Sequence, residues 1–199
     1  VQIVKDGVAI RRYRAGDYFG EMALLLDQPR SADAVALTDV DLIAIDRNDF
    51  LTVLRGSEML TRLERLVRVR DEGAWELLAK NSVLAALTSA QKTQLQTYLL
   101  PCQADDDQVL WRAGEVPAHA YLVDDATVTM RCPEGELKPF TCGAFLGEVD
   151  ALRTGVPAPS SARVTRTGKL FSIERADLGR FFDDNPGVYL SFLGARFIE

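Results

Sequence analysis

The sequence predicts an α+β protein that contains two copies of one domain. Residues 1–21 align without a gap with residues 128–148, at an offset of 127 positions. In both copies, segments with the apolar alternation of β-strands come before segments with apolar residues at helical spacing. A repeat of this length indicates a duplicated domain, and it outweighs any single local pattern.

Strands are expected first in the chain. Loose apolar alternation interrupted by Asp6 and Gly7 predicts a β-hairpin. Further strands are expected after a polar loop, with Thr38 and Asp39 as the break between them. The predicted strands of the first copy cover residues 1–5, 8–14, 34–36 and 41–45.

Helices are expected after these strands. Asp46 or Asn48 can cap a helix that carries Phe50 on its apolar face. Apolar spacing then predicts a longer helix that ends near residue 69 or 70. Two more helical segments are expected at residues 75–87 and, after a cap at residues 88–89, at residues 90–100.

Composition and charge exclude several classes of protein. The 199 residues are 47% hydrophobic and 26% charged, and the net charge of −6 argues against nucleic acid as a partner. No apolar run reaches membrane-spanning length, and no signal peptide is present. Cys102, Cys132 and Cys142 lack the paired spacing of a zinc site, so we expect reduced thiols and neither a metal nor a cofactor.

The segment from Phe19 to Ala32 combines residue types that suit a small anionic ligand with a sugar. Gly20 allows a sharp backbone turn, and the N–H groups of the short helix expected after it favour a phosphate. Arg30 can make two charge-assisted bonds to that phosphate. Glu21 would repel an anion, so its expected partner is a sugar hydroxyl. The ligand is then a nucleotide, and the alternative is a loop in which Arg30 and Glu21 only pair with each other.

This segment resembles the phosphate-binding cassette of cyclic nucleotide-binding domains, whose pattern is Phe-Gly-Glu-x-Ala-Leu, a few residues, then Pro-Arg-Ala/Ser/Thr-Ala. Residues 19–32 match at every signature position. The resemblance implies that each copy is a double-stranded β-helix (jelly roll) with flanking helices. It also implies that Glu21 holds the ribose 2′-hydroxyl and that Arg30 holds the cyclic phosphate. The complete predicted ligand set is Gly20, Glu21, Met22, Ala23, Arg30, Ser31 and Ala32.

The second copy has an opening that the first copy lacks. Residues 102–123 resemble the first strands of the family's roll, and nothing equivalent precedes Val1. We therefore expect the first copy to be an incomplete roll that lacks about thirty N-terminal residues. The predicted domains are residues 1–70 for the first copy, 71–100 for a helical linker and 101–199 for the second copy.

The second cassette departs from the family pattern. It keeps Gly147 and Glu148, but Ser160 followed by Ser161 stands at the position of Arg30, in a longer loop. A neutral hydroxyl cannot replace a bidentate cation, and this loss should cost about 2–3 kcal/mol of binding free energy. Asp150 adds a negative charge. Gly147, Glu148, Ser160 and Ser161 therefore form a doubtful second site. The other interpretation is that the second copy is a structural or docking domain.

Two residues bear on ligand selectivity. Ser31 follows the cassette arginine, where family members that prefer cGMP often have Ser or Thr, so the resemblance leaves cAMP and cGMP both open. Trp75 is the only tryptophan in the linker and a possible cap on the base of the ligand, although it can equally be a core residue.

The predicted function is a cyclic nucleotide-binding regulatory module. The chain resembles the regulatory subunits of cAMP-dependent protein kinase and, less closely, cGMP-dependent kinases. We expect a cytoplasmic, non-enzymatic protein, and the resemblance implies that its partner is a protein kinase catalytic subunit or another protein. The alternative is a scaffolding subunit that has kept the fold and lost the ligand. A transcription regulator would need a helix-turn-helix, and an enzyme would need a catalytic constellation; the sequence shows neither.

Overall fold

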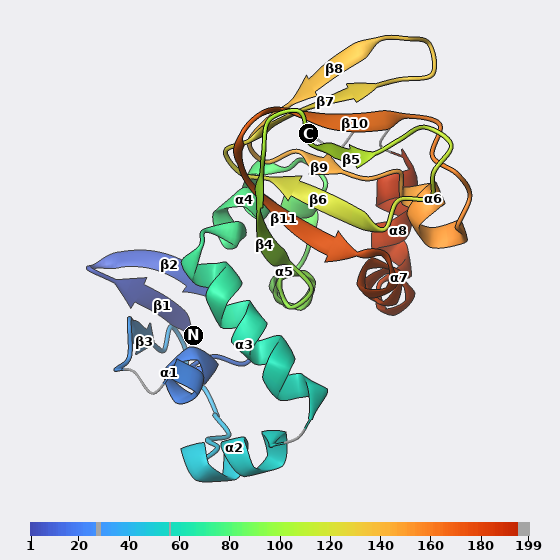
Figure 1. Cartoon of the computed structure of the whole chain (residues 1–199). Coiled ribbons are helices and arrows are strands. Elements are labelled where there is room, and N and C mark those ends of the chain that lie inside the picture. Colours follow the sequence, from blue (N-terminus) through green and yellow to red (C-terminus); the bar gives the residue numbers. More distant parts are fainter. Residues whose placement is uncertain (27–28, 56, 195–199) are drawn as a thin grey trace. The chain divides into compact units, whose positions relative to one another are not determined.

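The computed structural model of the chain describes residues 1–26, 29–55 and 57–194 (Figure 1). The chain divides into two compact units, Val1–Val67 and Arg68–Glu199. Helix α3 (Glu58–Asp71) begins in the first unit and ends in the second. The three-part division at residues 70 and 100 stays a prediction.

The first unit contains a three-stranded antiparallel sheet with the strand order β2-β1-β3. Asp6 and Gly7 connect the first two strands with φ angles of 51° and 77°. Two left-handed residues are what a tight hairpin turn needs, because they match the twist of the strands. The predicted hairpin is confirmed. The strands are β1 (Gln2–Lys5), β2 (Val8–Arg12) and β3 (Asp33–Val35).

The helices of the first unit are α1 (Glu21–Leu26), α2 (Arg47–Leu54) and the first part of α3. The Asp46 carboxylate accepts a hydrogen bond of 2.8 Å from the backbone N–H of Asn48, so Asp46 rather than Asn48 is the N-cap of α2. A small apolar core is formed by Leu54 of α2 together with Leu63 and Leu66 of α3. Helices α2 and α3 are therefore packed on each other.

The predicted strand at residues 41–45 is wrong. This segment has no regular structure, and its apolar side chains Leu42, Ile43 and Ile45 are 62%, 95% and 61% exposed. The repeat in the second unit explains the pattern, because the equivalent segment around Leu170 pairs with a strand on each side. A strand exists only through its hydrogen-bonded neighbours, and within the described residues none lies beside 41–45.

The second unit contains a β-roll made of two four-stranded sheets, in which every strand pair is antiparallel (Figure 1). One sheet has the order β5-β10-β7-β8 and the other has the order β4-β11-β6-β9. The strands are β4 (Leu100–Ala104), β5 (Val109–Trp111), β6 (His119–Val123), β7 (Thr127–Arg131), β8 (Leu137–Phe140), β9 (Phe145–Leu146), β10 (Ser161–Arg166) and β11 (Gly168–Glu174).

Two hydrophobic cores hold the second unit together. One lies inside the roll and includes Trp111, Val128 and Leu170. The other joins the outer face of one sheet, including Phe171, to the helices around it. The helices are α4 (Ala74–Lys80), the 3₁₀ helix η1 (Leu84–Ala86), α5 (Ser89–Gln96), α6 (Val149–Thr154), α7 (Arg175–Asp184) and α8 (Pro186–Gly194).

Two predicted helices differ from the structure, one by an internal break and the other at its C-terminal end. The helical stretch expected at 75–87 is broken at Asn81, whose buried amide oxygen accepts the N–H groups of Val83 and Leu84. The Thr88 cap is confirmed as a full capping box with Gln91. Helix α5 ends at Gln96, before the predicted end at residue 100, and Leu100 is instead the first residue of β4.

Membrane-spanning helices and metal-binding clusters are both absent from the residues that the structure describes. Across residues 1–26, 29–55 and 57–194, no helix combines the length and the apolar character that crossing a bilayer requires. In the same part of the chain, no group of three or more His, Cys, Asp or Glu side chains is arranged to hold a metal ion. The three cysteines are free thiols.

Candidate functional site

The first cassette, residues 19–32, turns sharply at Gly20 and then enters α1 at Glu21. Gly20 has a φ of +90°, a conformation that an L side chain rarely adopts. A Cβ atom at Gly20 would lie 3.0 Å from Nη1 of Arg30. Glycine is therefore needed here for the turn, and a larger residue would also make the Arg30 side chain shift.

Arg30 is held against this turn. Its Nη1 donates a hydrogen bond of 2.6 Å to the carbonyl oxygen of Gly20, the residue next to Glu21. The Arg30 side chain is exposed, whereas Glu21 is only 7% exposed. The guanidinium thus lies at the start of α1 with its remaining N–H groups open to solvent. A carboxylate in the first turn of a helix is favourable to the helix dipole.

The other predicted ligand residues lie on both sides of this turn. Ala23 is half-buried in α1, Ser31 is exposed, and Ala32 is half-buried just before β3. Met22 lies in α1, but its side chain is outside the described residues, as are Asp27 and Gln28. The predicted ligand roles of these side chains stay predictions.

The second cassette is closely packed. A Cβ atom at Gly147 would lie 2.8 Å from Cδ1 of Leu152 and 3.1 Å from Cβ of Ala120. The cassette helix α6 buries Val149, Ala151 and Leu152 in the cores of the second unit. This glycine is retained because another chain segment approaches it closely, which does not require a ligand.

Ser160, which replaces the cassette arginine, bonds to the cassette glutamate. Its hydroxyl is 2% exposed and donates a hydrogen bond to Oε1 of Glu148. The carboxylate that the family pattern assigns to a ribose therefore has an internal partner. Neighbouring Ser161 starts β10. Sequence reasoning identified the replacement but not this bond.

Two arginines close to the second cassette in the sequence, Arg153 and Arg163, are engaged elsewhere. Arg153 pairs with Asp183 at 2.7 Å and lies over the ring of Tyr189 at 4.9 Å. Arg163 pairs with Asp107. Neither side chain supplies a cation at Ser160. A surface hollow of about 480 Å³ between α6 and α7 includes Arg153, but it is separate from the Ser160–Glu148 pair.

Substitution of Ser160 tests this internal bond. We expect Ser160→Ala to lower the free energy of unfolding by about 1–2 kcal/mol, because it leaves a partly buried carboxylate oxygen without its donor. Chemical denaturation measures this effect. Ser191→Ala, which removes an exposed hydroxyl bonded to a carbonyl in α8, is the matched control and should change stability by less than about 0.5 kcal/mol. Equal stability of the two variants would contradict the role of Ser160.

Two titratable side chains, Cys102 and Tyr121, pack against the apolar core of the second roll. Burial raises the pKa of the Cys102 thiol, and burial together with the nearby Cys102 raises the pKa of the Tyr121 hydroxyl. The Tyr121 ring stacks on Trp111 with 6.4 Å between centroids. Both shifts disfavour the charged forms, so neither group offers a charge to an ionic ligand near pH 7.

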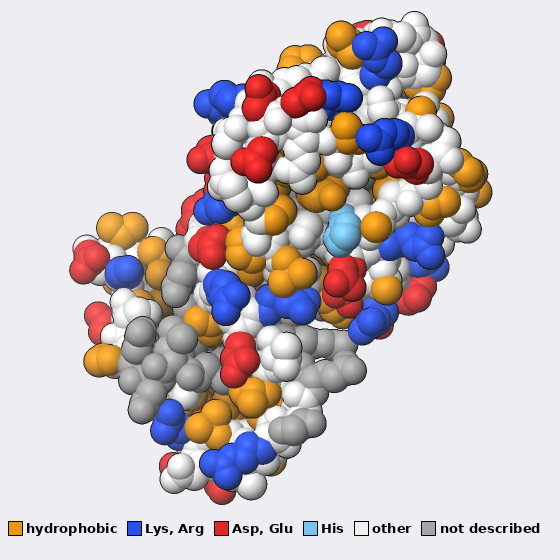
Figure 2. Space-filling model, viewed as in Figure 1, with side chains coloured by type: hydrophobic (Ala, Val, Ile, Leu, Met, Phe, Trp, Pro, Cys, Tyr) orange, Lys and Arg blue, Asp and Glu red, His pale blue; other side chains and the backbone are white. Residues whose placement is uncertain are grey.

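On the face of the molecule that Figure 2 shows, positive and negative side chains are mixed. Figure 2 shows Lys and Arg side chains interspersed with Asp and Glu, and the described residues on that face form no continuous basic stripe. A nucleic acid backbone is normally bound by such a stripe.

The cassette geometry and the duplicated fold define a class of protein. The model of the cyclic nucleotide-binding domain family matches residues 1–57 and 102–185 of the chain. The chain therefore belongs to the cyclic nucleotide-binding domain family, with two copies of the domain, as the sequence predicted. Both family segments include a cassette.

Two curated relatives show the range of proteins that carry this arrangement. The chain is 34% identical over its whole length to cGMP-dependent 3′,5′-cGMP phosphodiesterase A of Dictyostelium discoideum, of which it covers 23%. It is 30% identical over 85% of its length to a cAMP-dependent protein kinase regulatory subunit of Eremothecium gossypii, of which it covers 35%. The chain thus spans only 23% and 35% of the length of these two relatives.

Solved structures support the fold. The structure of cAMP-bound PfPKA-R has a TM-score of 0.56 and 20% identity, and the match covers 97% of this chain and 70% of that one. The guanosine-bound regulatory subunit of a cAMP-independent protein kinase A from Trypanosoma cruzi has a TM-score of 0.52 and 22% identity, with coverage of 97% and 66%. The fold of this chain resembles that of kinase regulatory subunits.

Proposed function

We propose that the first cassette binds one cyclic nucleotide and that binding controls a partner. The observation that carries this proposal is the position of Arg30, whose guanidinium lies on the Gly20 carbonyl beside the buried Glu21. A phosphate placed there would receive charge-assisted bonds from Arg30 and the backbone N–H groups of the turn, while Glu21 accepts from the ribose. Trp75 stays a candidate base cap; one face of its ring is covered by the Lys92 ammonium at 5.8 Å.

The partner is proposed from the relatives. A protein kinase catalytic subunit is the first candidate, supported by the likeness to kinase regulatory subunits. A phosphodiesterase catalytic domain is the second candidate, supported by the 34% identity over the whole chain to a cGMP-dependent phosphodiesterase. In both cases this chain is the non-enzymatic regulatory part of a cytoplasmic signalling protein. The ligand is cAMP in the first case and cGMP in the second, and Ser31 is compatible with either.

The second cassette is proposed to be structural. The Ser160 hydroxyl donates to Glu148, and Arg153 and Arg163 are paired with Asp183 and Asp107. An anion at this cassette would meet the Glu148 carboxylate without the arginine of the family pattern, which disfavours binding. One working site and one closed copy is the arrangement that these contacts support.

Calorimetric titration of the intact protein tests the proposed function. We expect cAMP or cGMP to bind with a stoichiometry of about one per chain. Adenosine and guanosine, which lack the phosphate that Arg30 would hold, should bind about 100-fold more weakly. Nucleosides that bind as tightly as cyclic nucleotides, or the absence of binding by both cyclic nucleotides, would contradict the proposal. A stoichiometry of two would contradict the closed second cassette.

A further inference from the structure

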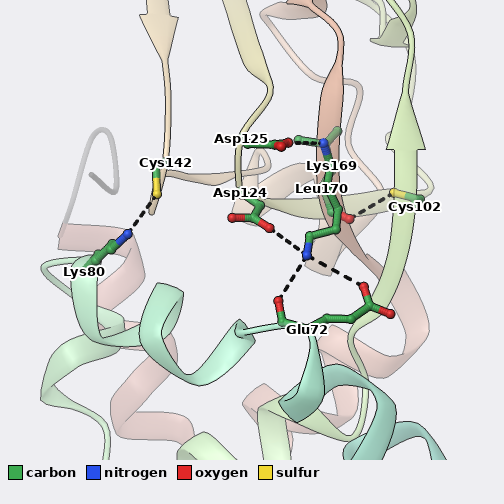
Figure 3. Close-up of polar contacts among 8 residues, drawn as sticks. All are labelled: Glu72, Lys80, Cys102, Asp124, Asp125, Cys142, Lys169 and Leu170. Atoms are coloured by element: carbon green, nitrogen blue, oxygen red, sulfur yellow. Dashed lines mark hydrogen bonds and ion pairs between the residues drawn. The ribbon is translucent and has the colours of Figure 1, made fainter.

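Lys169 connects the roll of the second unit to the end of helix α3 (Figure 3). Its ammonium donates a hydrogen bond of 3.1 Å to the carbonyl oxygen of Glu72 and pairs with Asp124 at 2.9 Å. The Glu72 carboxylate lies 3.8 Å from the same ammonium. All three side chains are one-quarter to one-third exposed, so solvent screens these contacts only in part.

The backbone of Lys169 is fixed by hydrogen bonds to two neighbouring residues of the roll, Asp124 and Asp125. Its N–H donates to the Asp125 carboxylate, and its carbonyl oxygen accepts the N–H of Asp124 at 3.2 Å. The preceding Gly168 has no room for a Cβ atom, because Ala126 backbone atoms lie 2.5 Å and 2.6 Å from that position. The lysine therefore extends from a rigid corner of the roll.

The Glu72 carbonyl belongs to the C-terminal end of α3. The Glu72 N–H still bonds to the carbonyl of Arg68 at 3.2 Å, and Gly73 then turns the chain with a φ of +83°. The last carbonyls of a helix have no partner within the helix and carry its negative dipole end. A lysine ammonium at this point satisfies one of those carbonyls, which favours a fixed end of α3.

The helix that follows cannot absorb a movement of α3. Helix α4 buries Ala74, Leu77 and Leu78 in the core of the second unit. At the C-terminal end of α4, the buried Asn81 amide donates a hydrogen bond of 2.9 Å to the Gly143 carbonyl oxygen. The Lys80 ammonium donates a hydrogen bond of 3.2 Å to the Cys142 sulfur (Figure 3). Helix α4 is therefore held in the core of the second unit, and Glu72 is the residue at which α3 leads into it.

In the first unit, contacts run from the cassette to α3. The Arg47 side chain of α2 donates a hydrogen bond of 3.1 Å to the carbonyl oxygen of Leu24 in α1, the helix of the first cassette. Leu54 of α2 packs with Leu63 and Leu66 of α3. A displacement of α1 can thus reach α3 through α2.

We propose that Lys169 is a positioning residue that anchors the end of α3 on the second roll, so that a ligand-driven movement of α3 is passed to residues 68–199. This proposal rests on the proposed function for its ligand. The anchor itself does not, because the contacts of Lys169 are made by residues of this chain alone. Spatial continuity alone does not show coupling, so the proposal needs a measurement of coupling.

Hydrogen exchange in the intact protein tests the anchor without ligand. We expect Lys169→Met, which keeps the length of the side chain but removes the ammonium, to increase exchange of the amides in residues 68–75 about tenfold. Lys138→Met is the matched control, because Lys138 also pairs with a carboxylate of the second roll, that of Glu136 at 3.7 Å, but both residues belong to the hairpin of β7 and β8. Unchanged exchange at 68–75 in Lys169→Met would overturn the proposal regardless of any ligand.

Exchange in the presence of saturating cAMP or cGMP then tests transmission. In the unmodified protein and in Lys138→Met, we expect ligand to change protection in residues 1–67 and also in residues 72–80 and 119–125. Lys169→Met should keep the first change and lose most of the second. If Lys169→Met transmits the change undiminished, the inference is wrong while the proposed function stands. If ligand changes nothing in the unmodified protein, the proposed function fails, and the ligand-free measurement still decides the anchor.

Discussion

Replacement of Arg30 by alanine should reduce the affinity for the cyclic nucleotide at least about 100-fold, which corresponds to about 2–3 kcal/mol. The guanidinium provides the charge-assisted bonds that a phosphate needs, and its exposed position beside the Gly20 turn leaves its outer N–H groups open to a ligand. Because the side chain is exposed and bonds to a single carbonyl among the described contacts, we expect the free energy of unfolding to change by less than about 0.5 kcal/mol. Titration calorimetry and chemical denaturation measure the two effects separately.

Two further variants make this result specific. Arg112→Ala removes an exposed arginine that also sits beside a turn and pairs with Glu115 at 3.8 Å, so it should bind ligand like the unmodified protein. Arg30→Lys keeps the charge but loses the planar fork, so its affinity should lie between those of Arg30→Ala and the unmodified protein. If Arg30→Ala and Arg112→Ala bind equally well, the cassette arginine does not hold the ligand, and the simple ion-pair interpretation of Arg30 and Glu21 becomes the better one.

The sequence was sufficient where the relevant signal is local or repeated. The hairpin at Asp6 and Gly7, the caps at Asp46 and Thr88, and the duplicated glycine-glutamate turns all depend on residues within a few positions of each other. Such residues fix backbone angles or satisfy helix ends regardless of the rest of the fold. The duplication added long-range information, because two weak patterns in register are more specific than one.

The sequence was not sufficient where the partner is distant in the chain. Residues 41–45 have a strand pattern, but a strand requires neighbours, and the described part of the first unit provides none there. The bond between Ser160 and Glu148 requires both ends of the second cassette to meet. The contact between Lys169 and Glu72 joins residues 97 positions apart. A lone lysine in a strand and a glutamate at a helix end carry no sign of each other in the sequence.

Replacement of Gly168 by alanine should lower the free energy of unfolding of the second unit by about 3 kcal/mol or more. The added Cβ atom would lie 2.5 Å from the backbone nitrogen of Ala126 and 2.6 Å from its Cα. These are backbone atoms of a tight corner, so they cannot move aside as a flexible side chain can, and overpacking is costly in such places. Chemical denaturation measures the loss, and a stability within 1 kcal/mol of the unmodified protein would contradict this account of the corner.

Gly179 provides the matched control, because it tests the same chemical change where there is space. It lies in the interior of α7, and nothing stands within 4 Å of the position of its Cβ. Gly179→Ala should therefore stabilise the second unit by about 0.5–1 kcal/mol, since alanine favours the helix and restricts the unfolded chain. Opposite signs for the two glycines would show that the corner at Gly168 is closed by packing. Since that corner holds the backbone of Lys169, a Gly168→Ala protein that remains folded should also exchange the amides of residues 68–75 faster, as Lys169→Met does.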